Sequence, residues 1–168
     1  DAFVATGQTW IAGNAWTDVS VTNIERGVLF PYNRSVAIYK CPADRSTVRD
    51  QGRLPRTRSV SMSDYMNDVT DPNDTSCWHR LSQVRDPGPT RALVFIDEHQ
   101  GSIENARFVI TQPGTWSWVD HPATRHQRGT VLSFADGHAE AWRWHEATTL
   151  SADRIAGWFV AALLVVAT

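Results

Sequence analysis

Six acidic and histidine side chains could supply the ligands of a metal site. They are Asp97, Glu98, Asp120, His126, Asp136 and His138. Carboxylates combined with carbonyl oxygens suit calcium, whereas mixed histidine and aspartate ligands favour zinc or another transition metal. A purely structural interpretation also fits: Asp136 shapes a turn, His126 makes one hydrogen bond, and Asp97 and Glu98 form the solvated end of a strand.

The same part of the chain contains the residue types of a hydrolase. Asp97 or Asp120 could orient His126 or His99, and Ser133 could act as the nucleophile. However, the sequence has no Gly-x-Ser-x-Gly segment, which would place a serine on a sharp turn between strand and helix. We therefore expect no catalysis, and a metal-dependent hydrolase ranks third among the functions considered.

Tryptophan is the most over-represented residue type, with eight copies in the chain. Two pairs stand two residues apart, which places both indoles of a pair on one side of a strand: Trp116 with Trp118, and Trp142 with Trp144. Such pairs could form a platform for sugar rings, or they could pack in the core and against arginines. An extracellular carbohydrate-binding module that binds a glycan is therefore the alternative function, and it requires exposed, coplanar indoles.

The strongest local prediction is a β-hairpin across residues 130–144. Asp136 and Gly137 separate two strand-like runs, and this pair is favoured in two-residue type I′ turns, where both residues need a positive φ. Counting outward from the turn pairs Ala135 with His138 and Phe134 with Ala139. This register predicts an apolar face and a polar face, made respectively by Leu132, Phe134, Ala139 and Ala141 and by Ser133, His138 and Glu140.

Other segments predict short elements around this hairpin. Thr22 and Glu25 match a capping box that begins a helix of about two turns, which ends before Pro31. We expect strands at 36–39, 59–62 and 92–96, and the last of these is apolar throughout and therefore central. Leu81 and Val84 indicate one helical turn. No βαβ alternation is visible, so the predicted fold class is α+β, with a mainly antiparallel β-sheet and short helices.

Length, composition and charge restrict the function classes. The chain of 168 residues, with 42% hydrophobic residues, predicts a single globular domain over 1–168. A formal net charge of -2 gives no electrostatic footprint for nucleic acid. Nearly all the basic residues are arginines, whose planar fork suits pairing and stacking. The apolar run 155–168 is about half the length needed to span a bilayer, so we expect a buried element there, although its role is unclear.

Several stretches resemble the prepilin-type, type II secretion pseudopilin-like proteins with a His-x9-Asp-Gly motif. The motif itself consists of His126, the nine residues Gln127 to Ala135, and then Asp136 and Gly137. Three upstream stretches also look like this family: residues 27–32, residues 39–46, which contain Cys41-Pro42-Ala43-Asp44, and residues 58–62, which begin with Arg58-Ser59. The resemblance extends over about residues 10–145.

This resemblance implies a pseudopilin-like globular head at the periplasmic or extracellular face of a bacterial cell envelope. Its role would be assembly or protein interaction in a type II secretion or type IV pilus-like apparatus, with other pilin-like subunits or secretion proteins as partners. Such proteins begin with an apolar helix that is cleaved, methylated and inserted in the membrane. We interpret the sequence, which starts at Asp1, as a processed or truncated product without that helix. Some of these relatives bind calcium, so the resemblance allows a calcium ion as cofactor but requires none.

An oxidising compartment also has a consequence for the two cysteines. Paired thiols of envelope proteins tend to be oxidised. We therefore expect a disulfide between Cys41 and Cys77, although the sequence permits such a bond without demanding it.

Overall fold

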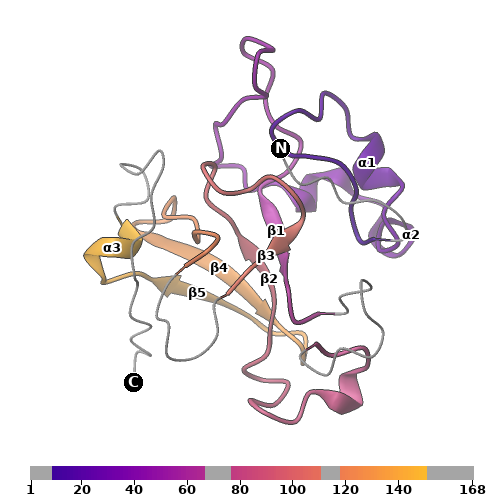
Figure 1. Cartoon of the computed structure of the whole chain (residues 1–168), viewed down its shortest axis with the longest axis vertical. Helices are drawn as coiled ribbons and strands as arrows, with labels where there is room; N and C mark the ends of the chain where they lie inside the picture. Colours follow the sequence, from indigo (N-terminus) through magenta and orange to yellow (C-terminus); the bar gives the residue numbers. More distant parts are fainter. Residues whose placement is uncertain (1–8, 67–76, 111–117, 151–168) are drawn as a thin grey trace.

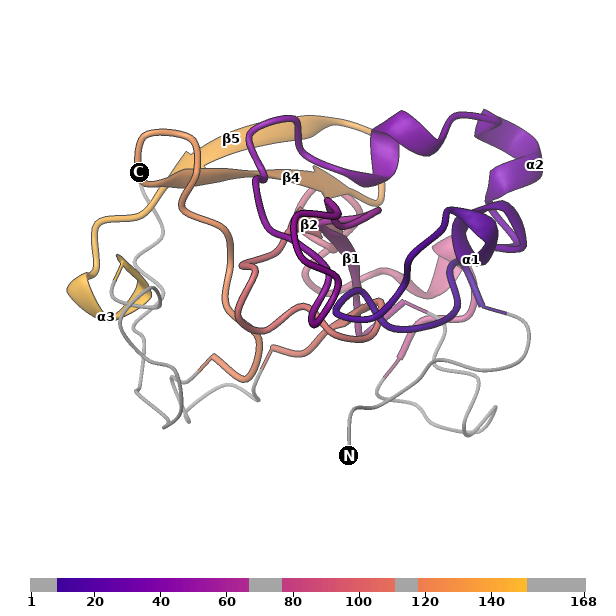
Figure 2. The same cartoon turned by 90° about the horizontal axis from the view of Figure 1, so that it is seen from above.

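The computed structural model describes residues 9–66, 77–110 and 118–150. In chain order the elements are α1 (Thr22–Glu25), α2 (Phe30–Asn33), the 3₁₀ helix η1 (Val36–Tyr39), β1 (Val60–Ser63), the 3₁₀ helix η2 (Leu81–Gln83), β2 (Leu93–Asp97), β3 (Arg107–Phe108), β4 (Gly129–Phe134), β5 (Ala139–Arg143) and α3 (Ala147–Leu150). The views in Figures 1 and 2 both place α1 and α2 at the end of the molecule away from α3. The predicted α+β class, with a sheet and few short helices, is confirmed.

One mixed sheet organises the described residues. Its five strands lie in the order β3-β1-β2-β4-β5. The pairs β1–β2, β2–β4 and β4–β5 are antiparallel, and only β1–β3 is parallel. The apolar segment expected to form the central strand does so as β2, and the half-buried strand expected at 59–62 corresponds to β1. Both strand predictions are confirmed.

The residues on one face of β1 and β2 are covered by the N-terminal segment. Val60, Met62 and Phe95 pack against a buried cluster formed by Trp10, Ile11, Ile24, Tyr39 and Ala106. Trp10 anchors this cluster by stacking on Tyr39 at 5.8 Å between ring centroids, and its indole N–H donates to the carbonyl of Ala106 at 3.0 Å. An indole buried with its N–H satisfied gains apolar contact without an unpaired donor.

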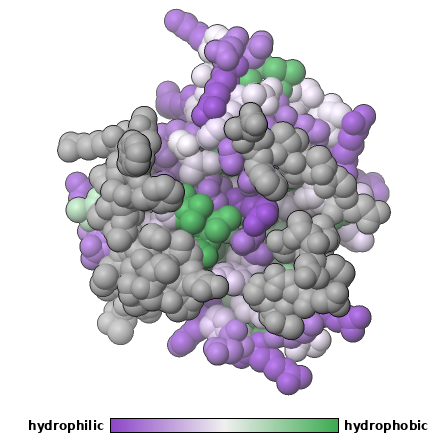
Figure 3. Space-filling view, viewed as in Figure 1, coloured by the Kyte–Doolittle hydropathy of each residue, from purple (hydrophilic) through white to green (hydrophobic). Residues whose placement is uncertain are grey.

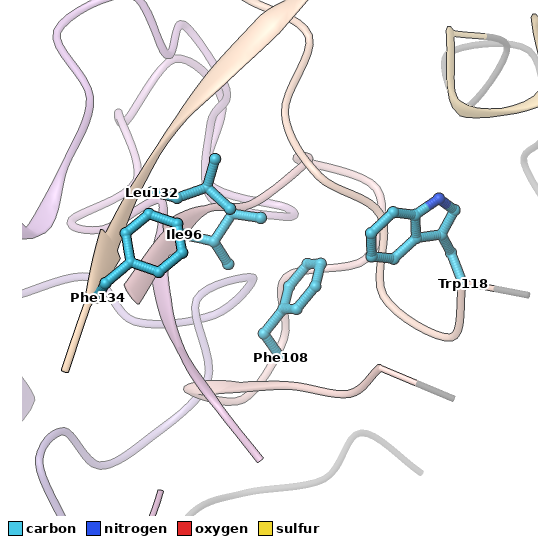
Figure 4. Packing of buried hydrophobic residues seen from close by; sticks show 5 residues of the cluster. All are labelled: Ile96, Phe108, Trp118, Leu132 and Phe134. Carbon is cyan, nitrogen blue, oxygen red and sulfur yellow. The ribbon is translucent and has the colours of Figure 1, made fainter. Parts of the chain in front are cut away.

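A second cluster packs on the opposite face of the sheet. It contains Ile96, Phe108, Trp118, Leu132 and Phe134, all at most 8% exposed. Figure 4 shows Ile96, Leu132 and Phe134 together, with the ring of Phe108 between them and Trp118. Phe108 meets Trp118 edge to face at 5.8 Å between centroids, a favoured geometry for aromatic pairs. The sheet is therefore buried on both faces near β2.

The N-terminal helical segment differs from the prediction. α1 is a single turn without a side-chain cap, its N-cap is Val21, and the predicted capping box of Thr22 and Glu25 is not formed. Pro31 does not end a helix but lies in the first turn of α2, where its fixed φ and missing N–H are tolerated. Residues 36–39 are predicted to form a strand, but they form the 3₁₀ helix η1. This turn packs Tyr39 against Trp10 and leaves Ile38 exposed.

The hairpin exists, but its register differs by one residue from the prediction. Ser133 pairs with Ala139, and Leu132 with Glu140. The loop has three residues, because the N–H of Phe134 donates to the carbonyl of His138 at 3.0 Å. Positive φ occurs at Gly137, 94°, and not at Asp136, so the type I′ turn is replaced by a longer loop with one left-handed glycine.

A shift of one residue moves every side chain of β5 to the other face. Leu132 and Phe134 are buried as predicted, whereas Ala139 and Ala141 are exposed. Their expected positions are taken by residues predicted to be polar and outward: the His138 ring stacks on Phe134 at 4.5 Å, and Glu140 pairs with Leu132. The predicted division of this hairpin into an apolar and a polar face is therefore wrong for β5.

The surface seen in Figure 3 is mainly hydrophilic where the chain is described, and hydrophobic colour gathers only in small groups. Within residues 9–66, 77–110 and 118–150 no helix is both long and apolar enough to cross a membrane. The predicted apolar element at 155–168 lies outside the described residues.

Candidate functional site

Three residues that are far apart in the sequence bring ligand atoms to one place. Cys41 follows η1, Asp97 is the last residue of β2, and His126 lies in the turn before β4. One sulfur, one carboxylate oxygen and one imidazole nitrogen lie within 4.8 Å of one another. The closest pair is Cys41 Sγ and His126 Nε2, at 3.2 Å. This is the only such group of three found among the described residues.

Ser59, the residue before β1, fixes the positions of two of these residues. Its hydroxyl accepts the backbone N–H of Cys41 at 2.9 Å and donates to Asp97 Oδ1 at 2.7 Å. Ser59 is fully buried and Asp97 is 6% exposed. The sheet explains the second bond, because Val60 pairs with Asp97 across β1 and β2. One hydroxyl thus connects the segment after η1 to the end of the central strand.

His126 is presented by a turn of unusual backbone conformation. Gln127 and Arg128 have φ values of 53° and 68°, and left-handed conformations of residues other than glycine cost about 1–3 kcal/mol each. A side chain at Gly129 is excluded, because a Cβ there would lie 2.2 Å from the carbonyl oxygen of Trp142. The close contact with β5 therefore requires glycine, and the strained pair before it turns the exposed His126 towards Cys41.

Arg125 holds the surrounding loops together. Its guanidinium donates to Asp97 Oδ1 at 2.7 Å and, from both terminal nitrogens, to the carbonyl of Glu98 at 3.0 Å. It also forms an ion pair with Asp44 at 3.4 Å, and its side chain is only 10% exposed. A forked cation can satisfy several acceptors at once. Arg125 thereby orients the Asp97 carboxylate and connects it to the Cys41–Asp44 turn.

The electrostatics of Cys41 do not favour a nucleophile. Burial raises the pKa of the thiol, and the Asp97 carboxylate raises it further, while the Ala43 N–H and Arg125 act in the opposite direction with a smaller total effect. Reactive cysteines need a lowered pKa, because the thiolate is the attacking species. In addition, an Asp97 oxygen lies within 4.8 Å of the sulfur, and Asp97 Oδ1 accepts hydrogen bonds from Ser59 and Arg125. The arrangement therefore lacks the activated thiolate of a cysteine hydrolase.

The residues predicted as metal ligands lie in three separate places. One of these is the site around Cys41. Asp97 and His126 come together, but Glu98 does not join them, because successive residues of a strand point to opposite faces. Glu98 is 1% exposed. Burial and the neighbouring Asp120 carboxyl raise the pKa of Glu98 well above its ordinary value. Asp120 instead accepts the backbone N–H of Val109 at 2.7 Å, and burial raises its pKa to about 6.

Asp136 and His138 lie at the tip of the hairpin, after the C-terminal end of β4, whereas His126 lies before the N-terminal end of this strand. The His138 ring contacts Asp136 on one side and Glu140 on the other, and the cluster is exposed. These carboxylates raise the pKa of His138, and His138 lowers that of Asp136. The Trp142 indole N–H, followed by His138, lowers the pKa of Glu140, so the cluster is a surface network of ion pairs and hydrogen bonds. The two halves of the His-x9-Asp-Gly motif do not touch.

Of the predicted hydrolase residues, Asp97 and His126 come together at this site, whereas Ser133 and His99 are bonded elsewhere. Ser133 lies in β4, where its hydroxyl accepts the backbone N–H of Phe95 at 3.2 Å. His99 is 5% exposed, and its Nδ1 accepts the N–H of Gly101 at 3.0 Å. Ser133 therefore bonds within the sheet, and His99 stabilises a turn.

Of the two predicted tryptophan pairs, the described members Trp118, Trp142 and Trp144 pack edge to face and form no flat platform. Trp118 is 8% exposed. Trp144 meets Trp118 at an interplanar angle of 73° and Trp142 at 70°. A hollow of about 520 Å³ near them contains only one of these indoles in its lining, Trp144. Trp116 lies outside the described residues. The three described indoles of the two predicted pairs therefore do not form the coplanar surface that sugar stacking requires.

The expected disulfide between Cys41 and Cys77, both in described parts of the chain, is not formed. Each sulfur instead faces a histidine: Cys41 faces His126, and Cys77 Sγ lies 3.5 Å from His79 Nε2. The physical reason is the sheet, since Cys41 is bonded to Ser59 before β1 begins, whereas the neighbour of Cys77, Trp78, bonds to Tyr65 after β1 has ended.

Comparison with protein-family models, with curated proteins and with solved structures finds no match. Sequence reasoning identified Asp97 and His126 but assigned Cys41 to a disulfide and gave Arg125 no role. The available signal was the motif set itself, because Cys41, Asp44, Arg125 and His126 all belong to the stretches that resemble pseudopilin-like proteins or border them.

Proposed function

We propose that this chain is the globular head of a pseudopilin-like subunit of a type II secretion or type IV pilus-like envelope apparatus. It acts through contacts with neighbouring proteins, and not through catalysis. Because the family resemblance rests on several short stretches of sequence, the main question is whether these stretches form one structural unit or are scattered over the fold.

Direct contacts between the stretches support the proposal. Cys41 meets His126 at 3.2 Å and bonds to Ser59 at 2.9 Å, and Arg125 reaches Asp44 at 3.4 Å. These contacts connect residues up to 85 positions apart in the chain. A coincidental set of short matches has no reason to converge, whereas residues that build one head do.

Three exposed apolar side chains suggest which region meets a neighbour. Val28, Tyr32 and Ile38 are 47%, 88% and 59% exposed, and they lie in or beside α1, α2 and η1. Large apolar side chains that water surrounds lower the free energy of association when a partner covers them. The segment from α1 to η1 is therefore the contact region to test.

The test is site-specific photo-cross-linking of the full-length protein in its native envelope. A photoreactive residue replaces Tyr32, and a matched control carries it at Arg53, which is exposed in another loop. We expect Tyr32 to cross-link to pilin-like or secretion-apparatus subunits, identified by mass spectrometry, several-fold more than Arg53 does. Saturable binding on a glycan array that is lost when Trp144 is replaced, or turnover on a hydrolase panel that is lost in His126→Ala, would contradict the proposal.

A further inference from the structure

The donor atoms around Cys41 have the spacing of a metal site. In a tetrahedral zinc site, ligand distances of about 2.3 Å for sulfur and about 2.0 Å for nitrogen place the two donors roughly 3.5 Å apart. Cys41 Sγ and His126 Nε2 are 3.2 Å apart, and an Asp97 oxygen lies within 4.8 Å of both. The three side chains can therefore contact one ion after small adjustments.

A second, independent feature is an unpaired oxygen of Asp97. Oδ1 accepts from Ser59 and Arg125, but Oδ2 is buried and has no hydrogen-bond partner. A buried carboxylate oxygen without a partner is costly. Because Oδ1 is already occupied by two donors, Oδ2 is the atom that remains for a cation.

The surroundings of the donors have the features of a supporting shell. Ligating carboxylates in metal sites are themselves hydrogen-bonded, which fixes their orientation. Ser59 and Arg125 do this for Asp97. His126 is exposed, so the site faces solvent on that side, where water can provide a fourth ligand.

We propose that Cys41, Asp97 and His126 bind one divalent transition-metal ion of the zinc type, which fastens the η1–β1 connection, the end of β2 and the turn before β4. Thiolate and imidazole are ligands of zinc or cobalt, whereas calcium prefers oxygen atoms alone. On binding, the Cys41 thiol releases its proton to solvent and the sulfur forms the metal bond. The thiolate and carboxylate together balance the charge of the ion. This inference does not depend on the proposed role in assembly.

The experiment uses the purified, metal-stripped protein and cobalt(II), with zinc and calcium as competitors. We expect one cobalt ion per chain, with the intense absorption of a sulfur-to-cobalt bond in the near ultraviolet. Zinc should displace cobalt and calcium should not. Cys41→Ser should remove the sulfur band, and His126→Ala, at an exposed position, should weaken binding at least tenfold while the protein stays folded by circular dichroism.

Matched controls use the second cysteine, Cys77, and a histidine at the other end of β4, His138. Cys77→Ser and His138→Ala should keep both the band and the affinity. The proposal is overturned if cobalt gives no sulfur band, if the band survives in Cys41→Ser, or if it is lost in Cys77→Ser instead. Failure of this experiment would leave the cross-linking result of the proposed function unaffected.

Discussion

Replacement of Arg58 tests how the fold connects its N-terminal segment to the sheet. Arg58 has no exposed surface. Its guanidinium donates to the carbonyl oxygens of Ala12, Gly13 and Glu104 at 3.0, 3.1 and 3.2 Å. Arg58 therefore joins the first described segment and the loop before β3 to the chain just before β1.

Two opposing contributions decide the size of the effect of Arg58→Met. Each buried carbonyl left without a donor costs about 1–3 kcal/mol. Burial, the largest cause, lowers the pKa of Arg58 well below its ordinary value, to about 10, so keeping the charge buried costs roughly 3 kcal/mol near neutral pH, which the variant regains. The carbonyl of Glu104 keeps a second donor, the N–H of Ala15 at 2.7 Å, so the carbonyls of Ala12 and Gly13 are the two that lose the guanidinium as donor. Their loss slightly exceeds the gain, and we expect a net destabilisation of about 1–3 kcal/mol.

The assay is urea unfolding at pH 7, followed by tryptophan fluorescence. Arg26→Met provides the matched control, because Arg26 is exposed and its replacement should change the free energy of unfolding by less than about 0.5 kcal/mol. Arg58→Lys should fall between the two, since one ammonium cannot reproduce the fork. If Arg58→Met were no less stable than Arg26→Met, the guanidinium would not hold these segments together.

Three further predictions concern the hairpin and a buried carboxyl. Gly137→Val should cost about 1–3 kcal/mol by strain alone, since Gly137 has a φ of 94° with open space around it; an unchanged melting temperature would contradict the turn. Leu132→Ala should cost about 2–5 kcal/mol and Ala141→Ser under about 0.5 kcal/mol, because Leu132 is 4% exposed and Ala141 is exposed. If urea unfolding gave equal losses for the two variants, Ala141 would be buried, as the register predicted from the sequence requires. The pKa of Asp120 is raised from 3.8 to about 6, first by burial, so ionising this carboxyl destabilises the fold progressively as pH rises from about 4 through 6. Asp120→Asn should therefore gain stability relative to the wild type between pH 4 and pH 7, and a difference that stays constant with pH would refute the shift.

The sequence predicted the strands better than the segments between them. The apolar run that forms β2 and the alternating run that forms β1 are confirmed, because hydrophobic pattern reports burial directly. The hairpin was located correctly, but its register depends on whether Asp136 or only Gly137 takes a positive φ, and both options fit the same dipeptide. Residues 36–39 have strand-like composition, yet the packing of Tyr39 against Trp10 favours a 3₁₀ turn.

The candidate site was predicted in part. His126 and Asp97 were named, but which partners they meet depends on how β1, β2 and β4 are ordered, and no local pattern contains that order. Alternation along β2 could have separated Asp97 from Glu98 in advance. The preference for arginine over lysine was the more informative signal. The side chains of Arg58 and Arg125 are both largely buried, and each guanidinium contacts acceptors from more than one segment of the chain.

The spacing of the His-x9-Asp-Gly motif also has a structural explanation. The nine residues consist of the left-handed pair Gln127 and Arg128, the six residues of β4, and Ala135, which opens the hairpin loop. β4 pairs with β2 through Leu132, Ser133 and Phe134, and the Thr130 hydroxyl donates to the carbonyl of Asp97, the last residue of β2, at 2.9 Å. The strand therefore has to be this long for the hairpin to turn at Gly137 while His126, at its other end, reaches Cys41. One residue fewer in β4 would either shift the register of the strand or withdraw the imidazole from the sulfur. The two motif halves are coupled through the strand between them, although they do not touch.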